Sequence, residues 1–182
     1  RQGIEIWDYN TTYVDPAASV GAGTALLPGT ILRGQTSIGK NCTIGPNSYL
    51  ENARVGDGTK VNASQIYNSS VGYDTHVGPF AYIRPGSSVG NCVRVGDFVE
   101  IKNSDVSDGT KISHLTYVGD SDVGKNVNFG CGTVTVNYDR AKKYRTVIED
   151  SAFIGCNTNL IAPVRVGEGA YIAAGSTTTD DI

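Results

Sequence analysis

Aliphatic side chains recur along the chain at intervals of six residues, and most are followed directly by Gly, Asp or Asn. This interval fits neither the 3.6-residue period of a helix nor the simple alternation of an ordinary strand. It fits a unit of one short strand and one turn, in which the aliphatic side chain points inward and Gly or Asn adopts the turn conformation. The run includes Val14, Val20, Leu26, Leu32, Ile38, Ile44 and Leu50, and it returns at Ile154, Leu160, Val166 and Ile172.

Three such units predict one triangular coil, and stacked coils pair their backbones with the coils on either side. The repeat therefore predicts an all-β protein, a parallel β-helix of hexapeptide repeats in which residues 1–182 form a single domain. At about 18 residues a coil, roughly eight or nine coils are expected. Five-residue steps, such as those from Val61 to Ile66 and from Ile66 to Val71, indicate tightened corners. The 23 glycines among 182 residues suit a fold with many corners.

Residues 137–146, N-Y-D-R-A-K-K-Y-R-T, interrupt the repeat and predict an inserted loop. Nowhere else in the chain is positive charge so dense. One interpretation is a solvated loop. The other is an arm that reaches an anionic ligand, because loops that project from a rigid solenoid often carry function. The cationic residues are Arg140, Lys142, Lys143 and Arg145.

Charge and composition narrow the class of protein. The net charge of −3 argues against a nucleic-acid partner, and no apolar run approaches the roughly 20 residues that span a membrane. The four cysteines form no C-x-x-C pair, so we expect reduced thiols and a cytoplasmic protein. The chain contains no Met, which we interpret as a piece of a longer protein. The cysteines are Cys42, Cys92, Cys131 and Cys156.

The two histidines are candidates for chemistry. A zinc site built on three His cannot form from two, so no metal site is expected. His76 lies in an ordinary hexapeptide and is expected to face solvent or serve structure. His114 lies in a polar stretch that can converge on one groove, especially with a neighbouring chain, and a neutral His suits a general base near neutral pH. Its candidate partners are Glu100, Lys102, Tyr117 and Asn128.

Unusual polar residues stand at fixed spacings between residues 77 and 181. With these segments the chain resembles the acetyltransferase domain of the bacterial bifunctional N-acetylglucosamine-1-phosphate uridyltransferase/glucosamine-1-phosphate N-acetyltransferase family. Residues before Val77 match only the general repeat. The segments are V-G-P-F-A-Y-I-R-P-G (77–86), V-G-D-F-V-E-I-K-N-S (95–104), H-L-T-Y-V-G-D (114–120), N-V-N-F-G-C-G-T-V-T-V-N-Y-D (126–139), L-I-A-P-V (160–164) and I-A-A-G-S-T (172–177).

The resemblance implies a role for each matching position. His114 corresponds to the general base, and Glu100 to an acid proposed to orient it. Positions for the phosphate end of the sugar are Arg84, Lys102 and Lys143, and those for the sugar are Tyr117 and Asn128. Positions for acetyl-CoA are Cys131, Asn137, Tyr138, Cys156 and Ala174.

The resemblance also implies an activity and an assembly. A homotrimer of left-handed β-helices, with active sites between subunits, would transfer the acetyl group of acetyl-CoA to the amine of glucosamine-1-phosphate without a metal. The product, N-acetylglucosamine-1-phosphate, is a step toward UDP-N-acetylglucosamine for the cell envelope. Uridyl transfer and its Mg²⁺ are expected in an N-terminal nucleotidyltransferase domain that this chain does not contain.

Three positions depart from the family pattern. Cys131 stands where Ala is usual and Cys156 where Ser is usual, and a thiol is a poor hydrogen-bond partner. Arg140 replaces a usual Gly, so the turn of the insertion is expected to differ. A last basic contact to acetyl-CoA would lie beyond Ile182.

Two other functions remain open from the residues. A hexapeptide acetyltransferase with another acceptor shares the coils, the trimer and the His, but does not need the combination of Arg84, Lys102 and Lys143. A non-catalytic β-helix that only trimerises or regulates a nucleotidyltransferase needs neither a base nor a basic arm.

Overall fold

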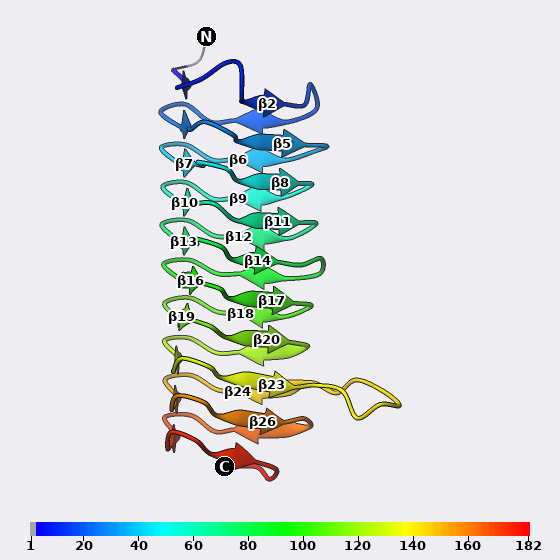
Figure 1. Cartoon of the computed structure of the whole chain (residues 1–182). Coiled ribbons are helices and arrows are strands. Elements are labelled where there is room, and N and C mark those ends of the chain that lie inside the picture. The colour runs from blue at the N-terminus through cyan, green and yellow to red at the C-terminus, as the bar shows by residue number, and fades with distance from the viewer. Residues whose placement is uncertain (1–2) are drawn as a thin grey trace.

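Residues 3–182 are described by a computed structural model, and they form a stack of 29 short strands without a helix (Figure 1). Strands three apart in the chain pair in parallel, which gives three sheets of ten, ten and nine strands. The predicted parallel β-helix is confirmed. It has about ten coils, close to the eight or nine expected. Thr43, Lys60 and His76 share one position on successive coils at intervals of 17 and 16 residues, so the tightened corners shorten the coils and leave room for more of them.

Sheet A consists of β1 (Glu5–Ile6), β4 (Ala25–Leu26), β7 (Thr43–Ile44), β10 (Lys60–Val61), β13 (His76–Val77), β16 (Arg94–Asp97), β19 (Lys111–His114), β22 (Asn128–Phe129), β25 (Phe153–Ile154) and β28 (Tyr171–Ile172). Sheet B consists of β2 (Tyr13–Val14), β5 (Ile31–Arg33), β8 (Tyr49–Glu51), β11 (Gln65–Tyr67), β14 (Tyr82–Ile83), β17 (Glu100–Lys102), β20 (Tyr117–Gly119), β23 (Val134–Val136), β26 (Asn159–Ile161) and β29 (Thr177–Thr178). Sheet C consists of β3 (Ser19–Val20), β6 (Ser37–Ile38), β9 (Arg54–Val55), β12 (Ser70–Val71), β15 (Ser88–Val89), β18 (Asp105–Val106), β21 (Ser121–Val123), β24 (Thr146–Ile148) and β27 (Val164–Val166).

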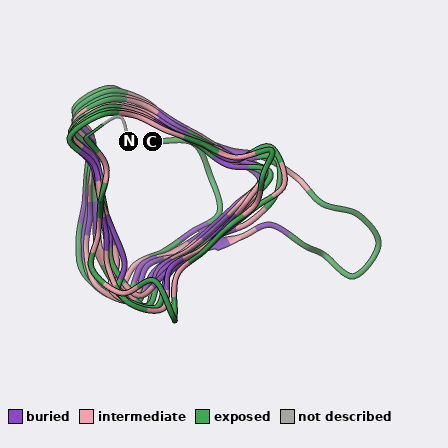
Figure 2. Cartoon of the chain, turned by 90° about the horizontal axis from the view of Figure 1, so that it is seen from above, coloured by how far each residue is buried: buried purple, intermediate pink, exposed green. Residues whose placement is uncertain are grey.

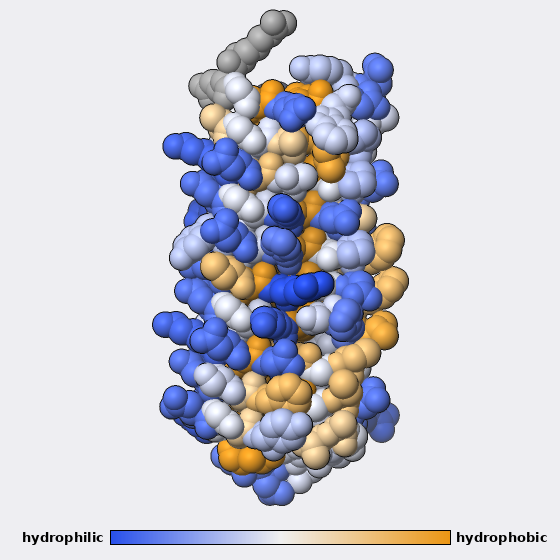
Figure 3. Space-filling model, turned by 90° about the vertical axis from the view of Figure 1, so that its left-hand side faces the viewer, coloured by the Kyte–Doolittle hydropathy of each residue, from blue (hydrophilic) through white to orange (hydrophobic). Residues whose placement is uncertain are grey.

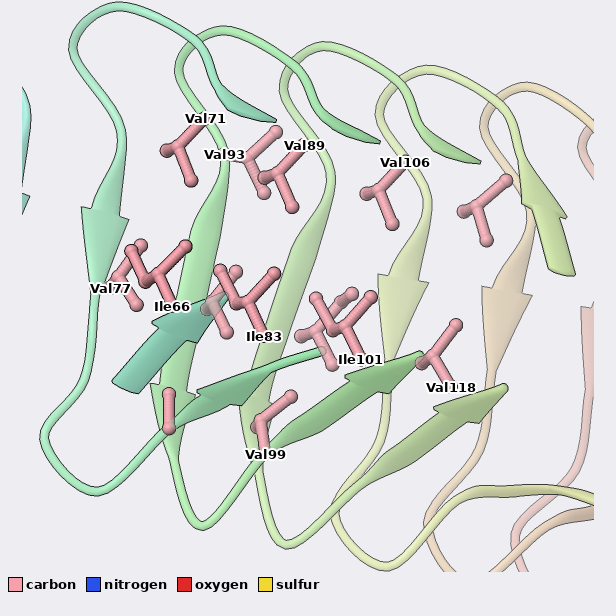
Figure 4. Close-up of a cluster of buried hydrophobic side chains, with 14 of the residues drawn as sticks. Ile66, Val71, Val77, Ile83, Val89, Val93, Val99, Ile101, Val106 and Val118 are labelled. Atoms are coloured by element: carbon pink, nitrogen blue, oxygen red, sulfur yellow. The ribbon is translucent and has the colours of Figure 1, made fainter. Parts of the chain in front are cut away.

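Aliphatic side chains fill the inside of the triangular prism in continuous ladders (Figure 4). In sheet B, Ile66, Ile83 and Ile101 stack on successive coils and are fully buried. Burial of one such side chain stabilises the fold by about 1.5–3 kcal/mol, so the ladders hold the coils in register. Val14 was expected inside but is 37% exposed, because its strand, β2, is the first of sheet B and has a neighbouring strand on one side only.

Asn residues shape many of the corners, as the repeat predicted. Asn52 and Asn68 adopt φ angles of 48° and 43°, a left-handed conformation that Asn tolerates better than most residues. Their side chains also link coils, since Asn52 Nδ2 donates to Asn68 Oδ1 at 3.2 Å and Asn52 Oδ1 accepts from the Gln35 amide at 3.0 Å. The corners are therefore hydrogen-bonded ladders in their own right.

Polar side chains cover most of the outer surface on the side of the stack that lies at the left of Figure 1, and apolar groups gather toward one edge of it (Figure 3). Phe80, Phe98 and Leu115 are among the exposed large apolar side chains of the described residues. The rings of Phe80 and Phe98 stack with their centroids 5.4 Å apart.

The predicted insertion leaves the stack as an arm between β23 and β24, and Figure 2 shows it projecting from one corner of the triangle. Its two halves meet in an antiparallel bridge between Tyr138 and Lys143. Thr146, expected in the insertion, already belongs to β24. Arg140 was expected to alter the turn but adopts a φ of 80°, and the turn is held by the Asp139 Oδ1 atom, which accepts from the Ala141 and Lys142 amides at 2.8 Å.

Candidate acyl-transfer site

Arg84 and Lys102 occupy one position on consecutive coils of sheet B, each one residue beyond the paired Ile83 and Ile101. The Arg84 guanidinium donates to Glu100 Oε1 at 2.8 Å and lies over the Tyr82 ring, 5.9 Å from its centroid. The hydrogen bond to Glu100 raises the pKa of Arg84 further above its ordinary value. Both cations therefore point outward from sheet B at the corner from which the arm leaves.

A buried carboxylate, Asp120, organises this corner. Its Oδ1 atom accepts from Asn103 Nδ2 at 2.6 Å, and its Oδ2 atom accepts from Lys102 Nζ at 3.3 Å and from the side-chain amide of Asn137. Burial alone would raise the pKa of Asp120, but the hydrogen bonds from Asn103, Lys102 and Asn137 outweigh it and hold the pKa below its ordinary value. Asp120 is therefore an anion that fixes both Lys102 and the first residue of the arm.

The arm brings Lys143 to the same corner. The ammonium group of Lys102 lowers the pKa of Lys143, with a further contribution from the charge of Arg84. Lys102 remains an ammonium group beside the Asp120 carboxylate, to which it donates at 3.3 Å. Three cations from three parts of the chain therefore converge, and their mutual repulsion favours the binding of an anion.

Arg145 fastens the base of the arm. Its Nε atom donates to Asp122 Oδ2 at 3.0 Å, and its terminal nitrogens donate to the carbonyl oxygens of Ser121 and Asn103 at 3.0 and 3.2 Å. These contacts hold the returning strand of the arm against the previous coil, which sets where Lys143 lies. The positive charge of the insertion thus divides into an anchor, Arg145, and a group that faces the cation cluster, Lys143.

Tyr117 lies flat against the backbone of β20. A Cβ atom on Gly119 would come within 2.4–2.6 Å of the Tyr117 ring and hydroxyl, so only glycine leaves room for this side chain. The Tyr117 hydroxyl accepts from Asn137 Nδ2 at 3.4 Å. The predicted sugar contact Tyr117 and the predicted acetyl-CoA contact Asn137 therefore touch in one chain.

His114 ends β19, at the corner between sheets A and B, and is exposed. Its Nδ1 atom lies 2.6 Å from Asp97 Oδ1. Glu100, the acid that sequence reasoning assigned to orient this ring, is instead paired with Arg84. The contact with His114 holds the pKa of Asp97 below its ordinary value.

Three of the predicted acetyl-CoA positions lie at the same corner as His114, on the three coils that follow it. His114, Cys131, Cys156 and Ala174 each lie two residues beyond paired positions of sheet A on four consecutive coils. The amide of Asn157 donates to the Cys131 carbonyl, and the amide of Gly175 to the Cys156 carbonyl, both at 2.7 Å. The general-base candidate thus stands at one end of a continuous strip of corner residues.

Two predicted residues lie apart from these groups. Asn128 is on β22, on the outward face of sheet A between Lys111 and Phe153. Tyr138 is on the arm, 55% exposed, and its hydroxyl donates to the Arg140 carbonyl at 2.7 Å. The roles of all these residues, including Glu100, stay predictions. Sequence reasoning missed Asp97 and Asp120, although both lie in the motif segments, because the hexapeptide pattern makes them ordinary corner residues.

The residues 3–182 contain no helix of the length and hydropathy that a membrane span requires. Within the same residues no three His, Cys, Asp or Glu side chains gather in a manner that suits a metal ion.

Comparison with known proteins places this geometry in a family. Residues 17–52 and 145–180 match the model of the bacterial transferase hexapeptide family. Over its whole length the chain is 51% identical to the bifunctional protein GlmU of Brevibacillus brevis, 53% to that of Geobacillus thermodenitrificans and 55% to that of Acetivibrio thermocellus. The chain is similar over its whole length to a continuous part of the GlmU proteins. The resemblance inferred from the motif segments is thereby confirmed, and the chain spans about 40% of the length of these GlmU relatives.

A solved structure supports the fold. The UDP-N-acetylglucosamine acyltransferase of Campylobacter jejuni superposes with a TM-score of 0.59 at 14% sequence identity, and the match covers 98% of this chain and 68% of that one. At this identity the likeness concerns the β-helix alone. The GlmU relatives, not this structure, bear on the residues of the site.

Proposed function

We propose that the protein acetylates the amine of glucosamine-1-phosphate, with acetyl-CoA as donor, to give N-acetylglucosamine-1-phosphate. The observation that carries this proposal is the convergence of Arg84, Lys102 and Lys143 at one corner of sheet B. Similarity to the GlmU proteins supports it, because the chain matches a continuous part of proteins described as bifunctional.

The cation cluster accounts for the phosphate of the acceptor. Lys102 and Lys143 repel each other in the free protein, and a phosphate dianion placed between them would relieve that repulsion. Hydrogen bonds between charged groups are worth about 1.5–3 kcal/mol each, so three cations distinguish a sugar phosphate strongly from the free sugar. Tyr117, beside the cluster, and Asn128 would contact the sugar.

The reaction is acyl transfer from a thioester to an amine. His114 takes a proton from the amine nitrogen, directly or through water, and the nitrogen forms a bond to the acetyl carbonyl carbon. The resulting tetrahedral oxyanion accepts hydrogen bonds from the protein, for which a backbone N–H near Cys131 is the candidate donor, and such a donor is worth about 3 kcal/mol. Collapse breaks the carbon–sulfur bond and releases the thiolate of CoA, and the step needs no metal.

Acetyl-CoA would lie along the corner strip below His114. Cys131, Cys156 and Ala174 follow one another along this strip, where amides of the next coil already hold the carbonyls of Cys131 and Cys156, and Asn137 and Tyr138 would add the predicted contacts from the arm. A backbone contact at Cys131 is indifferent to the side chain, whereas the thiol of Cys156 is a weaker partner than a hydroxyl. Backbone groups of this strip would therefore position the thioester, and the polarity of the side chains there would matter less.

A homotrimer with sites between subunits completes the proposal. Phe98 directly follows Asp97, Leu115 directly follows His114, and Phe80 occupies the same corner position one coil earlier. The three side chains, each 57–59% exposed, form an apolar ridge. All three adopt φ angles of 46–58°, a strained conformation for bulky residues. An exposed apolar ridge next to a candidate base suits a surface that a second copy of the chain covers. The neighbouring copy would also cover the exposed surface between the cation cluster and His114.

The product is a precursor of UDP-N-acetylglucosamine for the cell envelope. We infer that uridyl transfer and its Mg²⁺ belong to a nucleotidyltransferase domain of the longer relatives, and that residues 1–182 form the acetyltransferase domain. A cytoplasmic location agrees with the four free cysteines.

The test is an acceptor comparison with the whole chain, following release of the CoA thiol. With glucosamine-1-phosphate, kcat/KM is expected to exceed that with free glucosamine by at least about 100-fold, the equivalent of roughly 3 kcal/mol. Equal rates with both acceptors would favour an acetyltransferase for another acceptor. No thiol release with either, and no thermal stabilisation by acetyl-CoA, would favour a β-helix that only trimerises or regulates.

A further inference from the structure

Two strands of sheet A are longer than the rest. Among residues 3–182 only β16 and β19 have four residues, whereas every other strand has two or three. They are neighbours, and their pairing continues past the interior aliphatics Val95 and Ile112 to join Asp97 with His114. The sheet is therefore extended at one place, and the extension ends on the candidate base.

Gly96 makes this extension possible. A Cβ atom at Gly96 would lie 1.9 Å from the Ser113 carbonyl oxygen, so any larger residue would force β16 away from β19. The Leu115 amide then closes the extension by donating to the Asp97 carbonyl at 3.0 Å. Backbone pairing on both sides of the two side chains fixes their relative position, independently of any ligand.

The side-chain contact is short and specific. Asp97 Oδ1 lies 2.6 Å from His114 Nδ1, and both side chains are partly exposed, at 38% and 53%. Arg94, on the same strand as Asp97, helps to lower the pKa of Asp97 through its charge alone. Glu100 is paired with Arg84. A carboxylate next to Nδ1 favours the tautomer that carries its proton there, because only that tautomer donates to it.

We propose that Asp97 is the positioning residue of the acetyl transfer, which holds His114 in the Nδ1–H tautomer and leaves the lone pair of Nε2 free to take the proton of the substrate amine. The inference rests on the proposed function, since it assigns the orienting role to Asp97 in place of Glu100. Asp97 accepts one hydrogen bond and does not itself exchange a proton with the substrate.

Two substitutions of Asp97 test the role of its carboxylate. One removes the side-chain oxygens, and the other replaces the carboxylate with an amide of the same shape. Asp97→Ala removes the acceptor, and kcat is expected to fall by about 10- to 100-fold, part of the 10²- to 10⁴-fold that a general base contributes. KM for each substrate is expected to change by less than about threefold, since Asp97 would not contact substrate. Asp97→Asn keeps the shape of the side chain, but its amide can donate to Nδ1 and so favours the Nε2–H tautomer, and its kcat is expected to fall at least as far as that of Asp97→Ala. Glu168→Ala, which removes an exposed carboxylate at another corner, is the control and is expected to leave kcat unchanged.

Nitrogen-15 NMR of the histidines gives a readout that a purely structural role would not move. The chain has two histidines, and His76→Gln assigns the signals of His114. With neutral imidazole, Nδ1 is expected to be protonated in the unsubstituted chain, and both Asp97→Ala and Asp97→Asn are expected to shift the population toward Nε2–H.

The outcomes distinguish this inference from the proposed function. If the unsubstituted chain acetylates glucosamine-1-phosphate but Asp97→Ala keeps its kcat within twofold, or its tautomer is unchanged, the positioning role is wrong and the proposed function stands. An Asp97→Asn chain that keeps its kcat within twofold of the unsubstituted chain would also overturn it, because the amide can donate to Nδ1 whereas the carboxylate only accepts. If the unsubstituted chain has no activity, the proposed function fails, and the NMR comparison still tests the contact.

Discussion

Lys102, at the end of β17, lowers the pKa of Lys143 on the arm, so the two ammonium groups repel each other in the free protein. Asp120 neutralises Lys102 on its other side through the hydrogen bond at 3.3 Å. The arm therefore delivers a positive charge that the free protein leaves only partly compensated. A ligand with two negative charges at this point would compensate the remaining positive charge.

Binding of glucosamine-1-phosphate is expected to take up a proton at alkaline pH. The phosphate favours the ammonium form of Lys143 and raises its lowered pKa, so between the free and bound pKa values the complex holds more protons than the free protein. Affinity should therefore fall as pH rises through that window, below the ordinary lysine pKa of about 10.4. Isothermal titration calorimetry in two buffers of different ionisation enthalpy measures the uptake. Uptake that persists undiminished in Lys143→Ala would contradict the assignment to Lys143.

Lys143→Ala should weaken the acceptor site far more than Lys142→Ala. The loss of one charge-assisted contact of at least about 1.5 kcal/mol raises KM for glucosamine-1-phosphate about tenfold. Lys142 instead places its ammonium group over the Tyr144 ring, 4.7 Å from the centroid, and is the matched control on the same arm. Steady-state kinetics of both variants give the comparison. Equal, small effects would return the arm to the interpretation of a solvated loop.

His114→Ala should abolish most turnover while the sugar phosphate still binds. The imidazole acts on the amine proton, whereas the phosphate is held by cations elsewhere on the coil, so kcat should fall at least about 100-fold with little change in affinity. His76→Ala, an exposed side chain on β13, is the control. Retention of most activity in His114→Ala would exclude this residue as the base.

Phe98→Asn should dissociate the trimer without unfolding the coil. The substitution removes the centre of the apolar ridge, and Asn is better suited than Phe to the φ of 56° at this position. Light scattering across a concentration series should show monomers at concentrations where the unsubstituted chain is trimeric, with unchanged circular dichroism. Cys92→Asn, exposed at another corner with a φ of 54°, is the control. A variant that stays trimeric throughout would remove the ridge from the interface.

The fold was predictable because buried aliphatic residues recur at steps of five or six residues in nearly every coil. One buried aliphatic per strand fixes the strand, its face and its corner, so the register of distant residues follows from counting. Residues such as Ile83 and Ile101 lie where that count places them. Two places depart from the rule of one buried aliphatic per strand. The first coil has no neighbouring coil on one side, so Val14 is exposed. At Thr135 a buried hydroxyl replaces the aliphatic and accepts from the Gly119 amide.

The contacts of the site were less predictable. Asp97 and His114 are 17 residues apart, and they meet only because the coil between them is one residue short of 18 and Gly96 lets the strands close. Lys143 reaches Lys102 because the arm folds back, which no period encodes. Arg140 shows the limit of a conformational rule, since Asp139 and Tyr138 supply hydrogen bonds that hold its backbone at positive φ.

The most direct measurement of the central claim is carbon-13 NMR of the reaction with carbonyl-labelled acetyl-CoA and glucosamine-1-phosphate. The account predicts that the unsubstituted chain moves the label into an amide on the sugar nitrogen, with one free CoA thiol for each amide, and that His114→Ala does so at least about 100-fold more slowly. Label that stays in the thioester, or that appears only as acetate, would contradict it.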